Sequence, residues 1–208
     1  MARKNTRAMW AEKILKAESV SKNSNVLSLK KEPKLRALNS SPTFVRLAFS
    51  GIVVGIDPSL RGTGLAVVKM SPGKNPEFLE SLRVSNPAKL SQAECLGRIF
   101  RAVDRLCCKY DATAAAVEQS IYVQNNQTAL ILGSARGAAI AAAANFEIPV
   151  YEYPPLRIKQ AVVGFGRASK EQVSRTVASI LNIAPLGFDE SDAAAAALAH
   201  IFTHKEMV

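Results

Sequence analysis

The chain has 208 residues, enough for one ordinary domain and an appendage, and 48% of them are hydrophobic, as is usual in globular proteins. No apolar stretch is long enough and free enough of charge to span a bilayer, and no secretory signal is evident, so we expect neither a membrane protein nor a membrane partner. The formal net charge of +10 favours a partner that carries negative charge.

The positive charge is concentrated at the start of the chain. Residues 1–50 hold eleven Lys and Arg against three Glu, whereas the remainder holds sixteen basic and fourteen acidic residues. Residues 1–48 also lack sustained periodicity, so we predict a basic, disordered extension followed by a globular domain at 49–208. Three roles stay open for the extension: an arm that neutralises nucleic-acid phosphates, a solvated segment that binds nothing specific, or an organelle transit peptide.

A hairpin is predicted next, in residues 51–70, "GIVVGIDPSLRGTGLAVVKM". Two apolar, β-branched runs flank a turn rich in Pro and Gly, and "FLESLRVS" then predicts a third strand that completes a meander. The segment "KLSQAECLGRIFRAVDRLCCKY" predicts a helix, because apolar side chains recur at helical spacing at Leu90, Cys95, Ile99, Val103 and Leu106.

Strands and helices alternate in the rest of the chain. "ATAAAVEQ" and "IPVYEYPP" predict short strands, and between them "NQTALILGSARGAAIAAAANF" predicts a long helix with Asn126 or Thr128 as its cap. Three more helices are expected in "PPLRIKQAVVG", in "KEQVSRTVASILN" with Ser169 as its cap, and in "ESDAAAAALAHIFTHK". The order of elements predicts an α/β fold in which helices flank a mixed sheet.

The Cys and His content limits the kinds of metal site. Three cysteines are an odd count without metal-site spacing, and the adjacent Cys107 and Cys108 rarely bridge each other, so we expect a reduced, cytoplasmic setting. The two histidines both lie near the C-terminus, which excludes a His-rich site. A metal would therefore be bound by oxygen, and magnesium or manganese would suit it best.

Four carboxylates occupy positions where functional groups gather in an α/β sheet, at strand ends and helix starts. Asp57 ends the first apolar strand, where a carboxylate is costly unless something such as a metal ion pairs with it. Glu118 ends the strand "AAAVE", and Asp189 and Asp192 begin the last helix on one face. Taken singly, each is more simply a turn, a strand end or a helix cap. Together they could hold two divalent cations for in-line attack of water on a phosphodiester.

The sequence around these carboxylates resembles the RuvC family of Holliday junction resolvases. "GIDPSLRGTG" is similar to the first motif of the family, and "DESDAAAAALAH" is similar to its closing Asp-x-x-Asp helix. "VEQSIYVQNNQTALILGSARGAAIAAAANFEIPVYEYPPLRIKQAVVGFGRASKEQV" matches the central block nearly residue for residue. The resemblance covers residues 52–204, and the occurrence of these motifs in the right order makes it specific.

This resemblance implies an RNase H-like fold with a five-stranded mixed sheet between helices. It implies an endodeoxyribonuclease that resolves four-way DNA junctions in recombination and repair, with Asp57, Glu118, Asp189 and Asp192 as catalytic ligands of two magnesium ions that manganese can replace. It also implies a homodimer that nicks two symmetric strands, since a two-fold junction suits a two-fold enzyme, and a branch-migration motor complex as a further partner. The expected location is then the cytoplasm, at the nucleoid.

Several DNA contacts are implied by the same resemblance. Lys159 and Lys170 match basic residues near the scissile phosphate, where Lys159 would also stabilise developing charge. The loop after Glu118 carries, in the family, an aromatic that wedges against unstacked bases. Here Ile121 takes that place and Tyr122 follows it, so either could act as the wedge. Asn125 matches an asparagine of the same loop.

Other classes of protein share parts of this pattern. A catalytically inactive RNase H-like module that binds branched DNA is the main alternative, although retention of all four carboxylates speaks against it. Actin-like ATPases and sugar kinases also begin with a strand, an Asp and a Gly-rich turn, but they need a second phosphate loop and a longer chain. Related nucleases that act on RNA share the fold without the central block.

Overall fold

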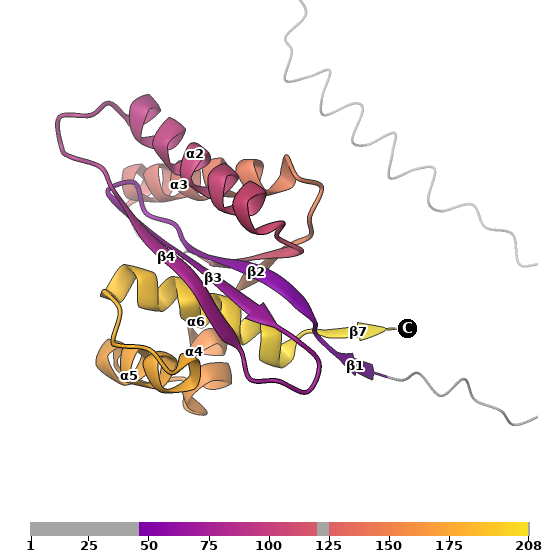
Figure 1. The fold of residues 1–208 in the computed structure, drawn as a ribbon. Helices are drawn as coiled ribbons and strands as arrows, with labels where there is room; N and C mark the ends of the chain where they lie inside the picture. Colours follow the sequence, from indigo (N-terminus) through magenta and orange to yellow (C-terminus); the bar gives the residue numbers. More distant parts are fainter. Residues whose placement is uncertain (1–45, 120–124, 208) are drawn as a thin grey trace, which may run out of the picture. The chain divides into compact units, whose positions relative to one another are not determined.

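The computed structural model describes residues 46–119 and 125–207, and it gives side chains for residues 49–204 within these ranges (Figure 1). The chain divides into two units, Met1–Thr43 and Phe44–Val208, and all described residues belong to the second. The predicted basic extension therefore lies outside the described residues up to position 45.

A five-stranded mixed sheet forms the centre of the described unit. Its strands, in the order in which they lie side by side, are β4 (Glu77–Ser85), β3 (Gly62–Met70), β2 (Gly51–Asp57), β5 (Ala114–Glu118) and β6 (Val150–Tyr153). The meander of β2, β3 and β4 is antiparallel, whereas β5 and β6 run parallel to β2. The predicted mixed sheet, including its meander, is confirmed.

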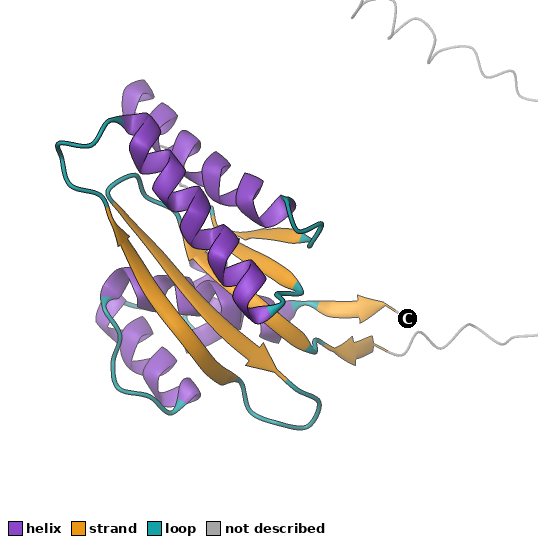
Figure 2. Cartoon of the chain, turned by 45° about the horizontal axis from the view of Figure 1, so that its top comes forward, coloured by secondary structure: helices purple, strands orange, loops and turns teal. Residues whose placement is uncertain are grey.

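Helices cover both faces of this sheet (Figures 1 and 2). One face carries α2 (Gln92–Tyr110) and α3 (Asn126–Ala144), and the other carries α4 (Pro155–Val163), α5 (Lys170–Leu181) and α6 (Phe188–Thr203). Alternation along the strands explains the two layers, because successive side chains point to opposite faces. Val53 accordingly lies in the α4–α6 core and Val54 in the α2–α3 core.

Side-chain caps were predicted for two helices, and the structure confirms one of the two predictions. Ser91 and Ser169 each form a capping box, accepting a hydrogen bond from the backbone N–H three residues ahead, and this confirms the prediction for Ser169. The prediction of Asn126 or Thr128 as the cap of α3 is wrong. Asn125 is the cap, and its Oδ1 accepts from the backbone of Gln127 and Thr128 at 2.9 and 3.1 Å. Adjacent Asn residues make such a one-residue shift invisible to sequence reasoning.

A second, two-stranded sheet was not predicted. β1 (Arg46–Ala48) pairs antiparallel with β7 (Lys205–Met207), so the end of the predicted extension meets the end of the chain. Strands of three residues are too short to show alternation, so no periodic pattern indicates them. Within the described ranges, no helix is long and apolar enough to cross a membrane.

Candidate active site

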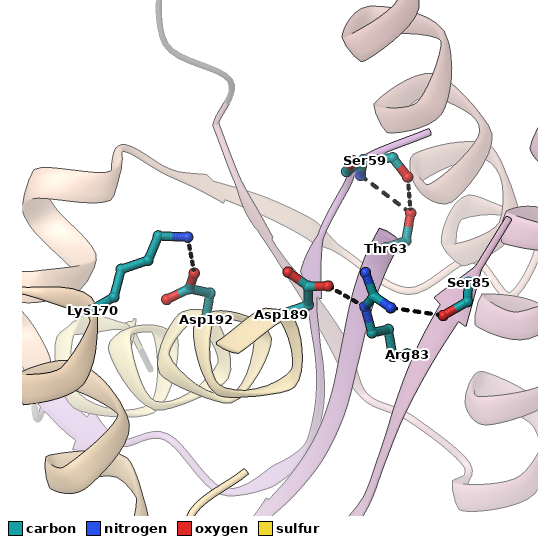
Figure 3. Close-up of polar contacts among 7 residues, drawn as sticks. All are labelled: Ser59, Thr63, Arg83, Ser85, Lys170, Asp189 and Asp192. Carbon is teal, nitrogen blue, oxygen red and sulfur yellow. Dashed lines mark hydrogen bonds and ion pairs between the residues drawn. The ribbon is translucent and has the colours of Figure 1, made fainter. Parts of the chain in front are cut away.

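The hairpin between β2 and β3 places Asp57 at an open end of the sheet. Asp57 is the last residue of β2, and the turn that follows is closed by Thr63, whose hydroxyl donates to the Ser59 carbonyl at 2.5 Å and accepts from the Ser59 N–H at 3.2 Å (Figure 3). Thr63 is fully buried, so this closure is protected from water. The buried strand therefore stops at Asp57 because a fixed turn begins there.

Glu118 reaches the same end of the sheet from the neighbouring strand. β5 runs parallel to β2, with Val117 opposite Ile56. Asp57 and Glu118 each follow one of these paired residues, so both carboxylates emerge from adjacent strands at their carboxyl ends. This edge of an α/β sheet is where functional groups are expected.

Two glycines allow α6 to lie directly on the sheet. A Cβ atom at Gly55 would come within 2.0 Å of the Ala193 carbonyl oxygen, and one at Gly64 within 1.8 Å of the Asp189 carbonyl oxygen. No side chain fits in either space, because such separations are far below van der Waals contact. The start of α6, which carries Asp189 and Asp192, is thereby held against the sheet beside the strand that ends in Asp57.

Asp57, Glu118 and Asp192 line one pocket of about 210 Å³. Lys159, from α4, and Lys170, from the start of α5, line it as well. Pro155, Ile158 and Val173 supply its apolar wall. Three of the four predicted carboxylates and both predicted lysines are thus brought together from five separate elements.

Burial and mutual repulsion favour the protonated form of two of these carboxyls. Burial raises the pKa of Asp57 to about 6, and the nearby Asp192 contributes to this rise, against a smaller opposing effect of Lys170. Burial likewise raises the pKa of Glu118 to about 8, with Asp57 as the next contribution. A bound cation would oppose these effects, because it favours the ionised forms of both carboxyls and compensates the charge that they then carry.

The two lysines are anchored within the pocket in different ways. Lys170 Nζ donates to Asp192 Oδ2 at 3.1 Å, and this contact raises the pKa of the ammonium (Figure 3). Lys159 Nζ donates to the Ala168 carbonyl at 2.8 Å, in the turn before α5. Both ammonium groups therefore stand beside the carboxylates with donor capacity left for an anion, since each carries three N–H bonds.

Asp189 differs from the other three carboxylates. Its Oδ2 accepts a hydrogen bond from Arg83 Nε on β4, and Arg83 Nη1 also donates to Ser85 Oγ at 2.9 Å. Figure 3 shows Arg83 on the side of Asp189 that faces away from Asp192 and Lys170. Asp189 is not among the residues that line the pocket. It lies next to the pocket, in an ion pair with Arg83. Sequence reasoning missed Arg83, because an Arg within a strand has no distinctive local pattern.

The donor set fits a hard divalent cation in its chemistry. Carboxylate oxygens are the ligands that magnesium and manganese prefer, and a cation would relieve the repulsion that contributes to the raised pKa values of Asp57 and Glu118. As the side chains of the described residues stand, no three or more His, Cys, Asp or Glu lie close enough together to hold a metal ion. Asp192 is paired with Lys170, so a cation held by Asp192 would compete with this ion pair.

The predicted DNA-contacting loop is described only at its edges. Ile121 and Tyr122 lie outside the described residues, so which of them acts as the wedge stays a prediction. Asn125 lies within them as the cap of α3, where its side chain accepts two backbone hydrogen bonds. The three cysteines are free, and of these only Cys108 is exposed.

A pH-dependent stability is expected for protein freed of metal with EDTA. A carboxyl with a higher pKa in the folded than in the unfolded chain makes the folded state bind more protons. The free energy of unfolding therefore falls as the pH rises from about 4.5 to about 8 through Glu118. Glu118→Gln should remove this fall, so the variant should gain stability relative to the parent as the pH approaches 8.

Urea unfolding of both proteins at several pH values measures this difference. Buried His200, whose pKa burial lowers to about 4, acts in the opposite direction at acid pH and cancels when the two proteins are subtracted. Parallel pH profiles for parent and variant would contradict the expected coupling.

Comparison with known proteins identifies a family. The family model described as crossover junction endodeoxyribonuclease RuvC matches residues 53–200. The protein of that name from Alkaliphilus oremlandii is 36% identical over 154 residues, which cover 73% of this chain and 93% of the relative. The one from Acinetobacter baylyi is 43% identical over 151 residues, which cover 72% of this chain and 82% of the relative.

Solved structures agree with this match. T. thermophilus RuvC in complex with Holliday junction substrate superposes with a TM-score of 0.69 at 34% identity, over 73% of this chain and 93% of that one. The yeast mitochondrial Holliday junction resolvase Ydc2 superposes with a TM-score of 0.53 over 72% of this chain and 78% of that one, and at 10% identity it supports the fold alone. The predicted RNase H-like fold is confirmed. Since the family model spans nearly the whole described unit and the relatives are matched over most of their length, the chain belongs to the RuvC family of crossover junction endodeoxyribonucleases.

Proposed function

We propose that this chain resolves Holliday junctions in DNA recombination and repair by metal-dependent nicking of two symmetric strands. The observation that carries the proposal is the pocket in which Asp57, Glu118 and Asp192 stand beside Lys159 and Lys170, within a chain of the RuvC family. An inactive module that only binds branched DNA is not favoured, because it would have no use for repelling, half-buried carboxyls.

Membership of the family implies a divalent metal, and we infer magnesium, with two ions at each site and manganese as a substitute. Such ions supply Lewis-acid activation of water and stabilise charge that develops on a phosphodiester. Asp57, Glu118 and Asp192 would hold them. Asp189 would be the fourth ligand in this proposal. Its carboxylate accepts a hydrogen bond from Arg83, so this contact would have to break before Asp189 could hold a metal ion.

The lysines have separate tasks in this proposal. Lys159, anchored to the Ala168 carbonyl, is fixed enough to stabilise negative charge at the scissile phosphate. Lys170 pairs with Asp192 in the free protein, and its ammonium would be free to hold the DNA backbone if Asp192 held a cation instead. Ile121 or Tyr122 would wedge into the crossover, and Asn125 would fix the start of α3 beside it.

The proposed substrate is a four-way DNA junction, the Holliday junction substrate with which the T. thermophilus relative forms a complex. A homodimer supplies the two sites that symmetric nicking requires. The small side chains of α3 would allow close packing between two copies, and Leu130 on this helix is 72% exposed. A branch-migration motor as a further partner, a nucleoid location and a DNA-binding role for residues 1–48 are expectations of the same proposal.

Cutting of a synthetic four-way junction tests the proposal, with linear duplex and single-stranded DNA of the same sequences as controls. We expect paired nicks at symmetric positions in the junction and little cutting of either control. Equal cutting of duplex and junction would contradict the proposed selectivity, and binding of the junction without any nick would favour the inactive alternative.

A further inference from the structure

A basic groove lies between β4 and α2, outside the carboxylate pocket. It has a volume of about 460 Å³, and three arginines line it: Arg83 from β4, and Arg98 and Arg101 from α2. Its other lining residues are apolar apart from Ser85, and none carries a carboxylate. The groove therefore gathers three positive charges without an acidic group in its wall.

Two of these arginines are not neutralised by neighbours. Within the part of the chain that the structure describes, Arg98 and Arg101 take part in none of the ion pairs. Glu94, one helical turn before Arg98, accepts from the backbone N–H and the hydroxyl of Ser91 instead, at 2.8 and 2.7 Å. Asp104, three residues after Arg101, makes no ion pair within the same described residues.

The next basic residues of α2 are arranged differently. Arg105 and Lys109 both pair with Glu80 on β4, at 3.3 and 2.6 Å, and Tyr110 donates to the same carboxylate at 2.7 Å. Glu80 on the sheet therefore neutralises Arg105 and Lys109. Arg98 and Arg101, which lie earlier on the same helix, have no such acidic partner among the described residues. An unbalanced pair of arginines in a hollow suits a polyanion, since a guanidinium matches a phosphate geometrically.

Arg83 connects this groove to the proposed site of cutting. The same side chain lines the groove and donates to Asp189, next to the carboxylate pocket (Figure 3). β4 is also an edge strand of the sheet, so no further strand of this sheet covers that side within the described residues. A DNA backbone that leaves the pocket past Asp189 would therefore meet Arg83 first and then the two arginines of α2.

We propose that this groove binds the phosphate backbone of the duplex arm that adjoins the cut site. The inference rests on the proposed function for the identity of the DNA, and on the groove itself for the contacts. Arginines that neutralise phosphates release condensed counterions, so the contacts should contribute to affinity in a salt-dependent way that does not depend on base sequence.

The test is a salt titration of DNA binding in EDTA, where we expect no cutting. The probes are a labelled four-way junction and a linear duplex as long as one arm. For Arg98→Gln/Arg101→Gln we expect weaker binding of both probes, and a slope of log affinity against log salt that is shallower by about 0.9 for each phosphate no longer neutralised. Arg98→Lys/Arg101→Lys should restore most of the slope, because the charge remains.

Arg105→Gln/Lys109→Gln is the matched control, since it also removes two positive charges from the same helix, at positions that Glu80 already balances. It should leave affinity and slope close to those of the parent. The groove would be overturned if Arg98→Gln/Arg101→Gln kept the parent's slope of log affinity against log salt. An equal loss in Arg105→Gln/Lys109→Gln would also overturn it, because it would indicate an effect of net charge alone.

The nicking activity of the parent separates this inference from the proposed function. If the parent nicks junctions but Arg98→Gln/Arg101→Gln has the parent's slope of log affinity against log salt, only the proposed role of the groove is refuted. If the parent binds DNA with an arginine-dependent slope but does not nick it, the groove stands and the resolvase function fails. Absence of any DNA binding by the parent would refute both.

Discussion

Asp57→Asn is expected to abolish the cutting of four-way junctions while leaving junction binding intact. The change removes one negative charge at the end of β2 and preserves the shape of the side chain, so the turn closed by Thr63 should be unaffected. We expect a fall in rate of about a thousandfold or more, since loss of one group aimed at developing charge already costs about 10²–10³. Single-turnover cutting and band-shift binding on the same junction measure the two effects.

Asp104→Asn is the matched control for this variant. Asp104 lies on α2, away from the pocket, and it pairs with none of the described basic residues, so both cutting and binding should resemble the parent. Substantial cutting by Asp57→Asn would remove Asp57 from the catalytic set. Loss of binding together with cutting would assign Asp57 a structural role.

Gly64→Ala should have the largest effect on stability. The new Cβ would lie within 1.8 Å of the Asp189 carbonyl oxygen, which belongs to the backbone of α6 and cannot rotate away. Overpacking of this kind costs about 1–3 kcal/mol or more, and here relief requires α6 to lift from β3. Since α6 carries Asp189 and Asp192, the same movement should separate them from Asp57 and abolish cutting.

Thermal or urea unfolding of Gly64→Ala, with Gly97→Ala as the control, measures this effect. A Cβ at Gly97, within α2, would meet only the flexible end of Arg101 at 3.3 Å, so that change should leave stability the same or raise it by up to about 1 kcal/mol. An unfolding midpoint for Gly64→Ala equal to that of the parent would contradict the close contact between α6 and the sheet.

Local sequence patterns predicted the elements that carry the site. Asp57 and Glu118 were found because each ends a short apolar run, and parallel pairing of β2 with β5 then makes such ends neighbours. Asp189 and Asp192 were found because an acidic pair precedes an alanine-rich helix. The resemblance to the RuvC family added the two lysines, and the pocket contains both.

Interactions between residues far apart in the chain were beyond such patterns. Arg83 and Asp189 are separated by 106 positions, and nothing near either residue indicates the other. The role of Gly55 and Gly64 under α6 depends on how a helix lies on a sheet, which composition does not specify. The groove of Arg98 and Arg101 likewise appears only when α2 is placed against β4 and Glu80 is seen to balance Arg105.

Metal exchange on a four-way junction tests most directly whether the carboxylate pocket is the centre of a metal-dependent nuclease. The intact chain is incubated with labelled junction in magnesium, manganese, calcium or EDTA, and nicks and binding are measured together. We expect symmetric nicks in magnesium and manganese, binding without cutting in calcium because its looser coordination does not hold a two-metal geometry, and no cutting in EDTA. Efficient cutting in EDTA would contradict this assignment of Asp57, Glu118, Asp189 and Asp192.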